Sequence, residues 1–226
     1  MLKNKTNIKI SLAINICIFI FTILASIIMF TGFKFMHGTD IVLESTKLGM
    51  FRFFTVDSNS LMGIVALVFA IKEIQLLKEE IKDIPLKYYI LKLMATSAVS
   101  LTFFVVFAYL GPISEGGIPI MLMNSNLFFH LIIPVLSILN FVLFEKTDKI
   151  KFKHVFSGLI PTLLYGVFYI GNVLIHMENG IVSTRYDWYW FLQNGVWTSI
   201  IVVPMILIIT YIIDLILWKL NKSYYK

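Results

Sequence analysis

Six long apolar runs divide the sequence and constrain its fold more than any other feature. Each is about 20 residues or longer, which is enough for a helix to cross the roughly 30 Å hydrocarbon core of a membrane. The runs cover residues 8–31, 49–71, 88–110, 121–144, 154–177 and 194–218. The first is too long for a secretory signal and lacks a small-residue cleavage site, so it counts as a span. Because the connections are short, we expect residues 1–226 to form one domain, an all-α bundle of six transmembrane helices.

The charged residues agree with a polytopic membrane protein. Only 14% of the residues are charged and 58% are hydrophobic, which lies outside the range of soluble domains. Lysines concentrate in the segments 3–9, 72–92, 146–153 and 219–226, whereas the alternate connections hold only Lys34, Lys47, Arg52 and Arg185. By the positive-inside rule, we therefore expect both termini in the cytoplasm.

The composition also indicates partners and location. The net charge of +6 comes from these loop lysines, so we expect contact with the bilayer and no nucleic-acid partner. The mixed-charge stretch 72–87, which includes Glu73, indicates a solvated hairpin.

The excess of Ile, Lys, Asn and Phe is typical of an AT-rich bacterial genome and favours a multi-pass protein of a bacterial plasma membrane. The single cysteine, Cys17, excludes an internal disulfide and a cysteine-based metal site. The oligomeric state is left open.

The second run begins with an unusual density of polar residues. At 100° per residue, Arg52, Thr55 and Asn59 fall on one helical face, while Asp57 points nearly the opposite way. If the helix starts near residue 49, Thr55 lies on the order of 10 Å inside its outer end. Polar groups at such depth are unfavourable in lipid, so the stripe predicts a functional site.

Two later runs carry matching polar faces. In the fourth, Asn126 and His130 share a face, and His130 lies at a depth close to that of Thr55. Pro134 removes the backbone hydrogen bond to the His130 carbonyl and is expected to loosen the helix there. The fifth run aligns Tyr165, Tyr169, Asn172 and His176. After it, residues 188–190 (Trp-Tyr-Trp) are typical of an aromatic belt at the membrane surface.

These residue types fit nucleophilic catalysis. A hydroxyl needs a base to take its proton, and neutral imidazole is the usual one. Two neutral groups are also easier to bury than an ion pair, so we predict that Thr55 is the nucleophile and His130 the base. Asn59, Asn126 and Tyr169 could orient the imidazole or bind an oxyanion. Arg52 could hold a substrate carboxylate or phosphate.

Three segments resemble a known family of six-span membrane proteins. Residues 53–59, Phe-Phe-Thr-Val-Asp-Ser-Asn, are similar to the Phe-Phe-Thr-x-x-Ser-Asn segment of the androgen-induced-gene-one and androgen-dependent tissue-factor-regulator family and its bacterial relatives. Residues 130–134, followed by Asn140 and Phe144, resemble its His-x-x-x-Pro stretch. Its later Pro, Tyr and Tyr-Pro-Tyr-x-Phe pattern is resembled by Pro161, Tyr165, Tyr169, Tyr186 and Phe191.

The resemblance covers most of the chain and implies a function. The eukaryotic members of that family are threonine hydrolases that cleave fatty acid esters of hydroxy fatty acids. Carried over, the roles of nucleophile and base fall on Thr55 and His130. A lipid ester is then the expected substrate, with no cofactor and no metal.

Other interpretations remain open at the level of sequence. Zn²⁺ could be bound by His37, Asp57, His130 and His176, which would give a metal-dependent lipid hydrolase. A carrier for a small molecule would need the polar stripe to continue inward, yet beyond Ser137 and Thr162 we expect an apolar interior. Haem ligation by His130 and His176 is a further alternative. In a purely structural role, Thr55 would bond to its own helix backbone.

Overall fold

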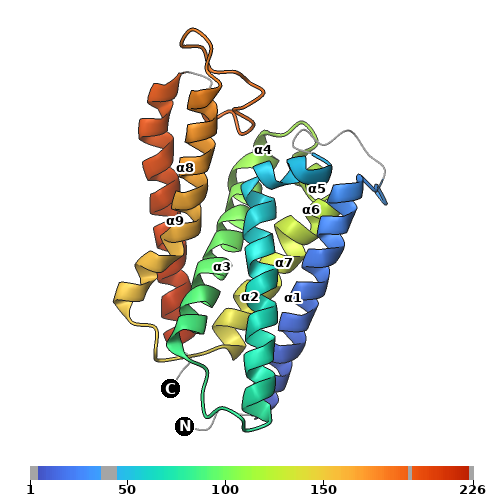
Figure 1. Cartoon of the computed structure of the whole chain (residues 1–226), viewed down its shortest axis with the longest axis vertical. Helices are drawn as coiled ribbons and strands as arrows, with labels where there is room; N and C mark the ends of the chain where they lie inside the picture. Colours follow the sequence, from blue (N-terminus) through green and yellow to red (C-terminus); the bar gives the residue numbers. More distant parts are fainter. Residues whose placement is uncertain (1–4, 37–44, 193–194, 224–226) are drawn as a thin grey trace.

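The computed structural model describes residues 5–36, 45–192 and 195–223, and these form a helical bundle without strands. Six helical stretches are long and apolar enough to cross a membrane, as predicted: Lys5–Thr31, Phe54–Leu77, Leu86–Ile113, Ser125–Phe144, Phe152–Ile175 and Ser199–Lys222. The chain alternates direction from one span to the next, so the start of α1 (Lys5–Thr31) and the end of α9 (Ser199–Ser223) lie at the same end (Figure 1). We call this end, which holds most of the lysines, the lysine-rich end. We call the other the Thr55 end.

The spans are not all regular α-helices. The third consists of α3 (Leu86–Val105), the π-helical η2 (Val106–Leu110) and α4 (Gly111–Ile113). The fourth consists of α6 (Ser125–Leu127), the π-helical η3 (Phe128–Ile132), α7 (Ile133–Leu139) and the π-helical η4 (Asn140–Phe144). Pro134 is the second residue of α7, which follows η3 directly. As expected, the helix therefore departs from α geometry at His130.

Shorter elements connect these spans. A 3₁₀ turn, η1 (Lys47–Arg52), precedes α2 (Phe54–Leu77), and α5 (Gly117–Met121) lies between α4 and α6. The 3₁₀ segment η5 (Phe152–Gly158) leads into α8 (Leu159–Ile175), and η6 (Val196–Thr198) leads into α9. Several predicted boundaries differ from the structure. The second span covers Phe54–Leu77 and not residues 49–71, because Phe53 is extended and separates η1 from α2. The fourth span begins at Ser125 and not at residue 121, and the last begins at Ser199 and not at residue 194.

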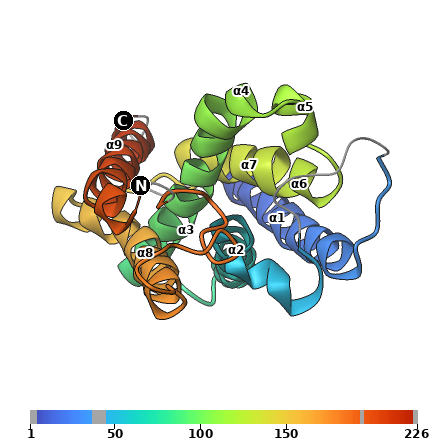
Figure 2. The ribbon, with the colours of Figure 1, turned by 90° about the horizontal axis from the view of Figure 1, so that it is seen from above.

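The third span forms the centre of the bundle. It contacts α2 and α7 on one side and α8 and α9 on the other (Figure 2). Within its most apolar stretch 61% of the residues are buried, against 22% and 17% for the fifth and sixth spans. Large apolar side chains therefore remain exposed on α8 and α9, among them Leu164, Val167, Ile200 and Ile201. Such surfaces are stable when lipid covers them.

α1 and α2 approach closely at Gly63. A Cβ atom placed on Gly63 would lie 2.7 Å from Thr22 Cγ2, so only glycine allows this contact. Thr22 donates its hydroxyl to the carbonyl of Ile18 at 2.9 Å, which satisfies the polar group inside the helix pair. A contact between helices is the role that small and hydroxyl residues commonly have in membrane proteins.

The interior of the lysine-rich half is not apolar, which corrects the prediction. It buries Asn15, Glu73, Lys92, Asn140, Glu145 and Asp214, each with at most 3% of its surface exposed. Glu73 was expected in a solvated hairpin, but α2 continues to Leu77 and carries its side chain into the bundle. The chain can bury these groups because those other than Asp214 bond to one another across several helices.

Candidate active site

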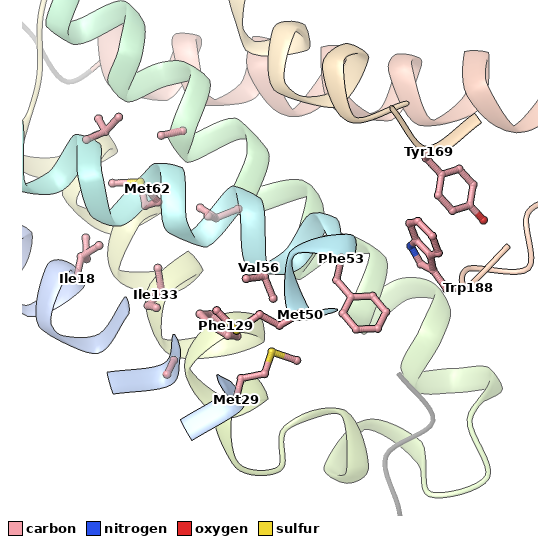
Figure 3. Close-up of a cluster of buried hydrophobic side chains, with 14 of the residues drawn as sticks. Ile18, Met29, Met50, Phe53, Val56, Met62, Phe129, Ile133, Tyr169 and Trp188 are labelled. Carbon is pink, nitrogen blue, oxygen red and sulfur yellow. The ribbon is translucent and has the colours of Figure 1, made fainter. Parts of the chain in front are cut away.

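Thr55 lies in the first turn of α2, at the Thr55 end of the bundle. It is the second residue of the helix, so it is not about two turns inside, as the sequence suggested. The first turn of a helix has backbone N–H groups without helical partners and a partial positive charge. Phe53 and Val56, which lie close to Thr55 in the sequence, belong to an apolar cluster that also contains Met29, Met50 and Phe129 (Figure 3).

Tyr189 reaches this helix start from the loop between α8 and η6. Its hydroxyl accepts the Phe54 N–H at 2.9 Å and so caps α2 from a distant part of the chain. Its ring packs against Tyr165 and Tyr169. Burial raises the pKa of Tyr189 to about 12, so the hydroxyl keeps its proton near neutral pH and can donate it. Sequence reasoning missed this residue.

A buried carboxylate, Asp187, organises the same loop. It accepts the N–H of Phe191 at 3.1 Å and that of Leu192 at 2.9 Å, as well as the Tyr169 hydroxyl. Trp188, expected in a surface belt, is only 7% exposed. Trp190 is exposed, whereas its two neighbours turn inward and do not fit the belt interpretation. Both fold inward because Asp187 fixes the turn.

His130 is buried in η3 with its ring held by the main chain. Its Nδ1 lies 2.6 Å from the carbonyl oxygen of Met121, the last residue of α5. A carbonyl can only accept, so Nδ1 carries the proton and Nε2 of the neutral ring has a free lone pair. Nε2 can therefore act as a base.

Thr55 and His130 line one cavity. Asn126 and Tyr189 complete its polar lining, and Met29, Phe53, Val56, Leu110 and Met121 form the rest. The structure thus brings the two predicted catalytic residues to the same small space. This cavity measures about 400 Å³, its opening included.

Thr55 also lines a second, larger cavity. It measures about 850 Å³ by the same measure and lies between the third span, α8 and α9. Its walls are mainly apolar, with Leu101, Val105, Ile170, Val202, Val203 and Ile206 among the lining residues. Thr55, Leu110 and Tyr189 line both cavities. Thr55 therefore lies between an apolar cavity and the cavity that His130 lines.

Asn59 links the segments that carry Thr55 and His130. Its side-chain amide donates to the Thr55 carbonyl at 2.7 Å and to the Phe129 carbonyl at 3.1 Å. Phe129 directly precedes His130, so one buried amide connects the start of α2 to η3. The amide was predicted to orient the imidazole or bind an oxyanion, but its bonds are to these two backbone carbonyls.

Tyr165 and Tyr169 lie on the wall of the larger cavity. The Tyr165 hydroxyl donates to the Arg52 carbonyl at 2.5 Å and accepts the Trp188 indole N–H at 3.1 Å. Tyr169 donates its hydroxyl to Asp187. Both tyrosines therefore connect α8 to the segments that surround Thr55.

Four predicted site residues line neither cavity, namely Asn59, Arg52, Asn172 and His176. The Arg52 guanidinium packs over the rings of Phe53, at 4.8 Å, and Trp188, at 5.9 Å, and η1 places it outside α2. His176 stacks on Tyr186 with ring centroids 3.7 Å apart, and its Nδ1 bonds the Asn172 carbonyl at 2.8 Å. The polar stripe of α8 therefore reaches the cavities only as far as Tyr169.

The proposed zinc ligands are not brought together. Asp57 lines a different cavity, with Pro161 and Phe168, on another side of α2. His130 and His176 have the separate surroundings described above, and His37 lies outside the described residues. Among the described residues, no group of three His, Cys, Asp or Glu side chains could hold a metal ion.

The fold and topology define an integral, multi-pass membrane protein of the all-helical class. A scan of protein-family models found no match to the chain, and neither the curated proteins nor the solved structures contain a match.

Proposed function

We propose that the protein is an intramembrane hydrolase of fatty-acyl esters, with Thr55 as nucleophile and His130 as base. The observation that supports this most is the position of Thr55, between the larger apolar cavity and the cavity lined by His130. Sites that bind small ligands typically have mainly apolar linings with a few polar groups. The larger cavity suits an acyl chain. The smaller cavity, which Asn126, His130 and Tyr189 line, suits the ester group.

The first half of the reaction forms an acyl-threonine. The Thr55 oxygen attacks the ester carbonyl while His130 Nε2 takes its proton. The carbonyl oxygen becomes an oxyanion, to which Tyr189 can donate its hydroxyl proton, because that hydroxyl accepts the Phe54 N–H. As the carbon–oxygen bond to the alcohol breaks, the imidazolium returns its proton to the departing alcohol.

The second half releases the acid. A water molecule enters where the alcohol left and gives a proton to His130 as it attacks the acyl-threonine carbonyl. The Thr55 oxygen then leaves and recovers that proton from the imidazolium. The net reaction is ester plus water to acid plus alcohol. The resemblance of residues 53–59 and 130–134 favours fatty acid esters of hydroxy fatty acids as the substrate.

Labelling with a fluorophosphonate probe tests the proposal. The probe should phosphonylate Thr55 in the purified protein, and labelling should be lost in Thr55→Ala and His130→Ala. Thr162→Ala is the matched control, because Thr162 lines the same larger cavity. A peptide map should locate the label on Thr55. Equal labelling of Thr55→Ala and the wild type would overturn the assignment.

A carrier for a small molecule is the second candidate. The main argument against a carrier was the apolar interior expected from the sequence. The lysine-rich half buries charged groups instead, so that argument no longer applies. A carrier would move a labelled lipid or ion across reconstituted vesicles, and transport would survive in Thr55→Ala. A hydrolase would lose its activity in that variant.

A further inference from the structure

A second polar site lies at the lysine-rich end, far along the bundle from Thr55. Six side chains from four spans form it, and we call it the Glu145 cluster: Ser11 and Asn15 of α1, Glu73 of α2, Lys92 of α3, Asn140 of η4 and Glu145 just after η4. All six are buried, with at most 3% of their surface exposed. The proposed hydrolase reaction makes no use of them.

Hydrogen bonds converge on one oxygen of this cluster. Glu145 Oε1 lies 2.8 Å from Lys92 Nζ and accepts the side-chain amides of Asn15 and Asn140, each at 2.9 Å. Lys92 also donates to Asn15 Oδ1, and Asn15 Nδ2 donates to Glu73 Oε2 at 3.0 Å. The side-chain amide of Asn15 therefore donates to both carboxyl groups and links them.

The charges of the cluster do not balance when both carboxyl groups are ionised. Lys92 supplies one positive charge, and Glu73 and Glu145 supply two negative ones. Ser11 and Asn15 of α1 and Asn140 of η4 are neutral, as is Asn221 of α9, which donates to the Glu145 carbonyl at 3.1 Å. On α3, the ring of Tyr89 packs against Phe69, which also faces Lys92. One further positive charge is needed in a site that excludes water.

The same cluster lacks a hydrogen-bond donor. Glu145 Oε2 and Asn140 Oδ1 are both buried and neither has a partner, although buried oxygens normally have one. The two groups adjoin, because Asn140 Nδ2 bonds the other oxygen of the same carboxyl group. A proton supplies both missing elements: it neutralises one carboxylate and creates a donor for an unpartnered oxygen.

We propose that the Glu145 cluster is a proton-binding site, in which the Glu73 and Glu145 pair holds one exchangeable proton. The proton comes from water at the lysine-rich end and forms an O–H bond with one carboxylate oxygen. Access is short, because Glu73 lies four residues, or about 6 Å, from the end of α2 at Leu77. Lys92 pairs with Glu145 and offsets the negative charge that remains on the two carboxyl groups.

Infrared difference spectroscopy between acidic and basic pH tests this site in the purified protein. A protonated carboxyl group gives a C=O band that disappears when the proton leaves. We expect such a band in the wild type and its loss in Glu73→Gln, together with one fewer proton released per chain in a titration. The amide oxygen of the new glutamine can still accept the bond from Asn15, so this variant should fold.

Two further arms make the result decisive. Asp57→Asn/Asp214→Asn removes two carboxyl groups of the spans that lie outside the cluster, the partly buried Asp57 and the buried Asp214, and the band should persist in it. Loss of the band in this double variant would overturn the proposal. Persistence of the band in both Glu73→Gln and Glu145→Gln would also overturn it. Addition of Na⁺ at constant pH should leave the band unchanged. If Na⁺ abolishes the band and an organic cation does not, the site binds a metal cation and the proton assignment is wrong.

Discussion

The two halves of the bundle bury polar side chains in opposite ways. At the Thr55 end, the two cavities that meet at Thr55 are lined by uncharged polar groups, and space remains beside them. In the lysine-rich half, Lys92 pairs directly with Glu145, and the Asn15 amide joins that pair to Glu73. A neutral hydroxyl and imidazole can stay in an apolar space until a substrate arrives. Buried charges cannot, and therefore need partners in the resting protein.

Removal of one buried charge should produce the largest change in stability. Lys92→Met removes the cation that pairs with Glu145, and breaking a buried ion pair typically costs about 3–5 kcal/mol. We expect a clear fall in the thermal unfolding temperature in detergent. The fall should be smaller at acidic pH, where protons neutralise the carboxylates.

Lys5→Met is the matched control for that prediction. Lys5 pairs with Glu79 at 3.0 Å, but both side chains are mostly exposed, at 69% and 77%. Its removal should hardly change the unfolding temperature. Equal losses in the two variants would contradict the contrast between the two kinds of ion pair.

The next effect concerns the rate of hydrolysis at the Thr55 end. Tyr189→Phe keeps the ring and removes the proposed oxyanion donor, so kcat for a fatty-acyl ester should fall by about 10²-fold. Because the Phe54 N–H also loses its acceptor, the unfolding temperature should be measured in parallel. Tyr186→Phe is the control, because Tyr186 stacks on His176 outside both cavities. An unchanged kcat in Tyr189→Phe would exclude this role.

A smaller effect is expected from the link between α2 and η3. Asn59→Ala breaks the bonds to the Thr55 and Phe129 carbonyls. It should lower the free energy of unfolding by about 2 kcal/mol and reduce kcat more than it raises KM. Asn172→Ala serves for comparison, because the Asn172 amide nitrogen is buried without a partner. If both variants lose the same stability, the Asn59 bonds do not brace the site.

The smallest effect should come from a hydroxyl that has no partner. Thr162 Oγ1 is buried and unbonded, so Thr162→Val should leave stability unchanged or raise it by up to about 1 kcal/mol. Thr102→Val should lower stability, because Thr102 bonds the Ser58 hydroxyl at 3.1 Å. Chemical denaturation of both variants in detergent would separate them. A loss of stability in Thr162→Val would reveal a partner for that hydroxyl.

The amino-acid sequence predicts the six spans well because each apolar run is long and bounded by charges or turn residues. It also pairs Thr55 with His130, since both lie near the same end of the bundle. The start of α2 escaped prediction. An extended Phe53 interrupts a continuous apolar run, and no proline or glycine marks the break. The depth assigned to Thr55 was wrong for that reason.

Contacts between distant segments were beyond sequence reasoning. Tyr189 was grouped with its tryptophan neighbours. No pattern in the sequence shows that the turn at Asp187 brings the Tyr189 hydroxyl to the Phe54 N–H. Asp187 itself, an acidic residue among aromatics, was the available signal. Glu73 and Lys92 appeared to be loop charges because their partners, Asn15 and Glu145, lie more than 50 residues away. Only tertiary structure reveals such bonds.

α8 and α9, the two spans that bury the least surface, also form much of the wall of the larger cavity. An ester dissolved among the acyl chains of the bilayer therefore meets this thin wall before any water. For a hydrolase of this shape, turnover would follow the number of ester molecules per lipid, not their concentration in solution. Dilution with inert lipid would then slow the reaction, even with the total amounts of enzyme and ester held constant.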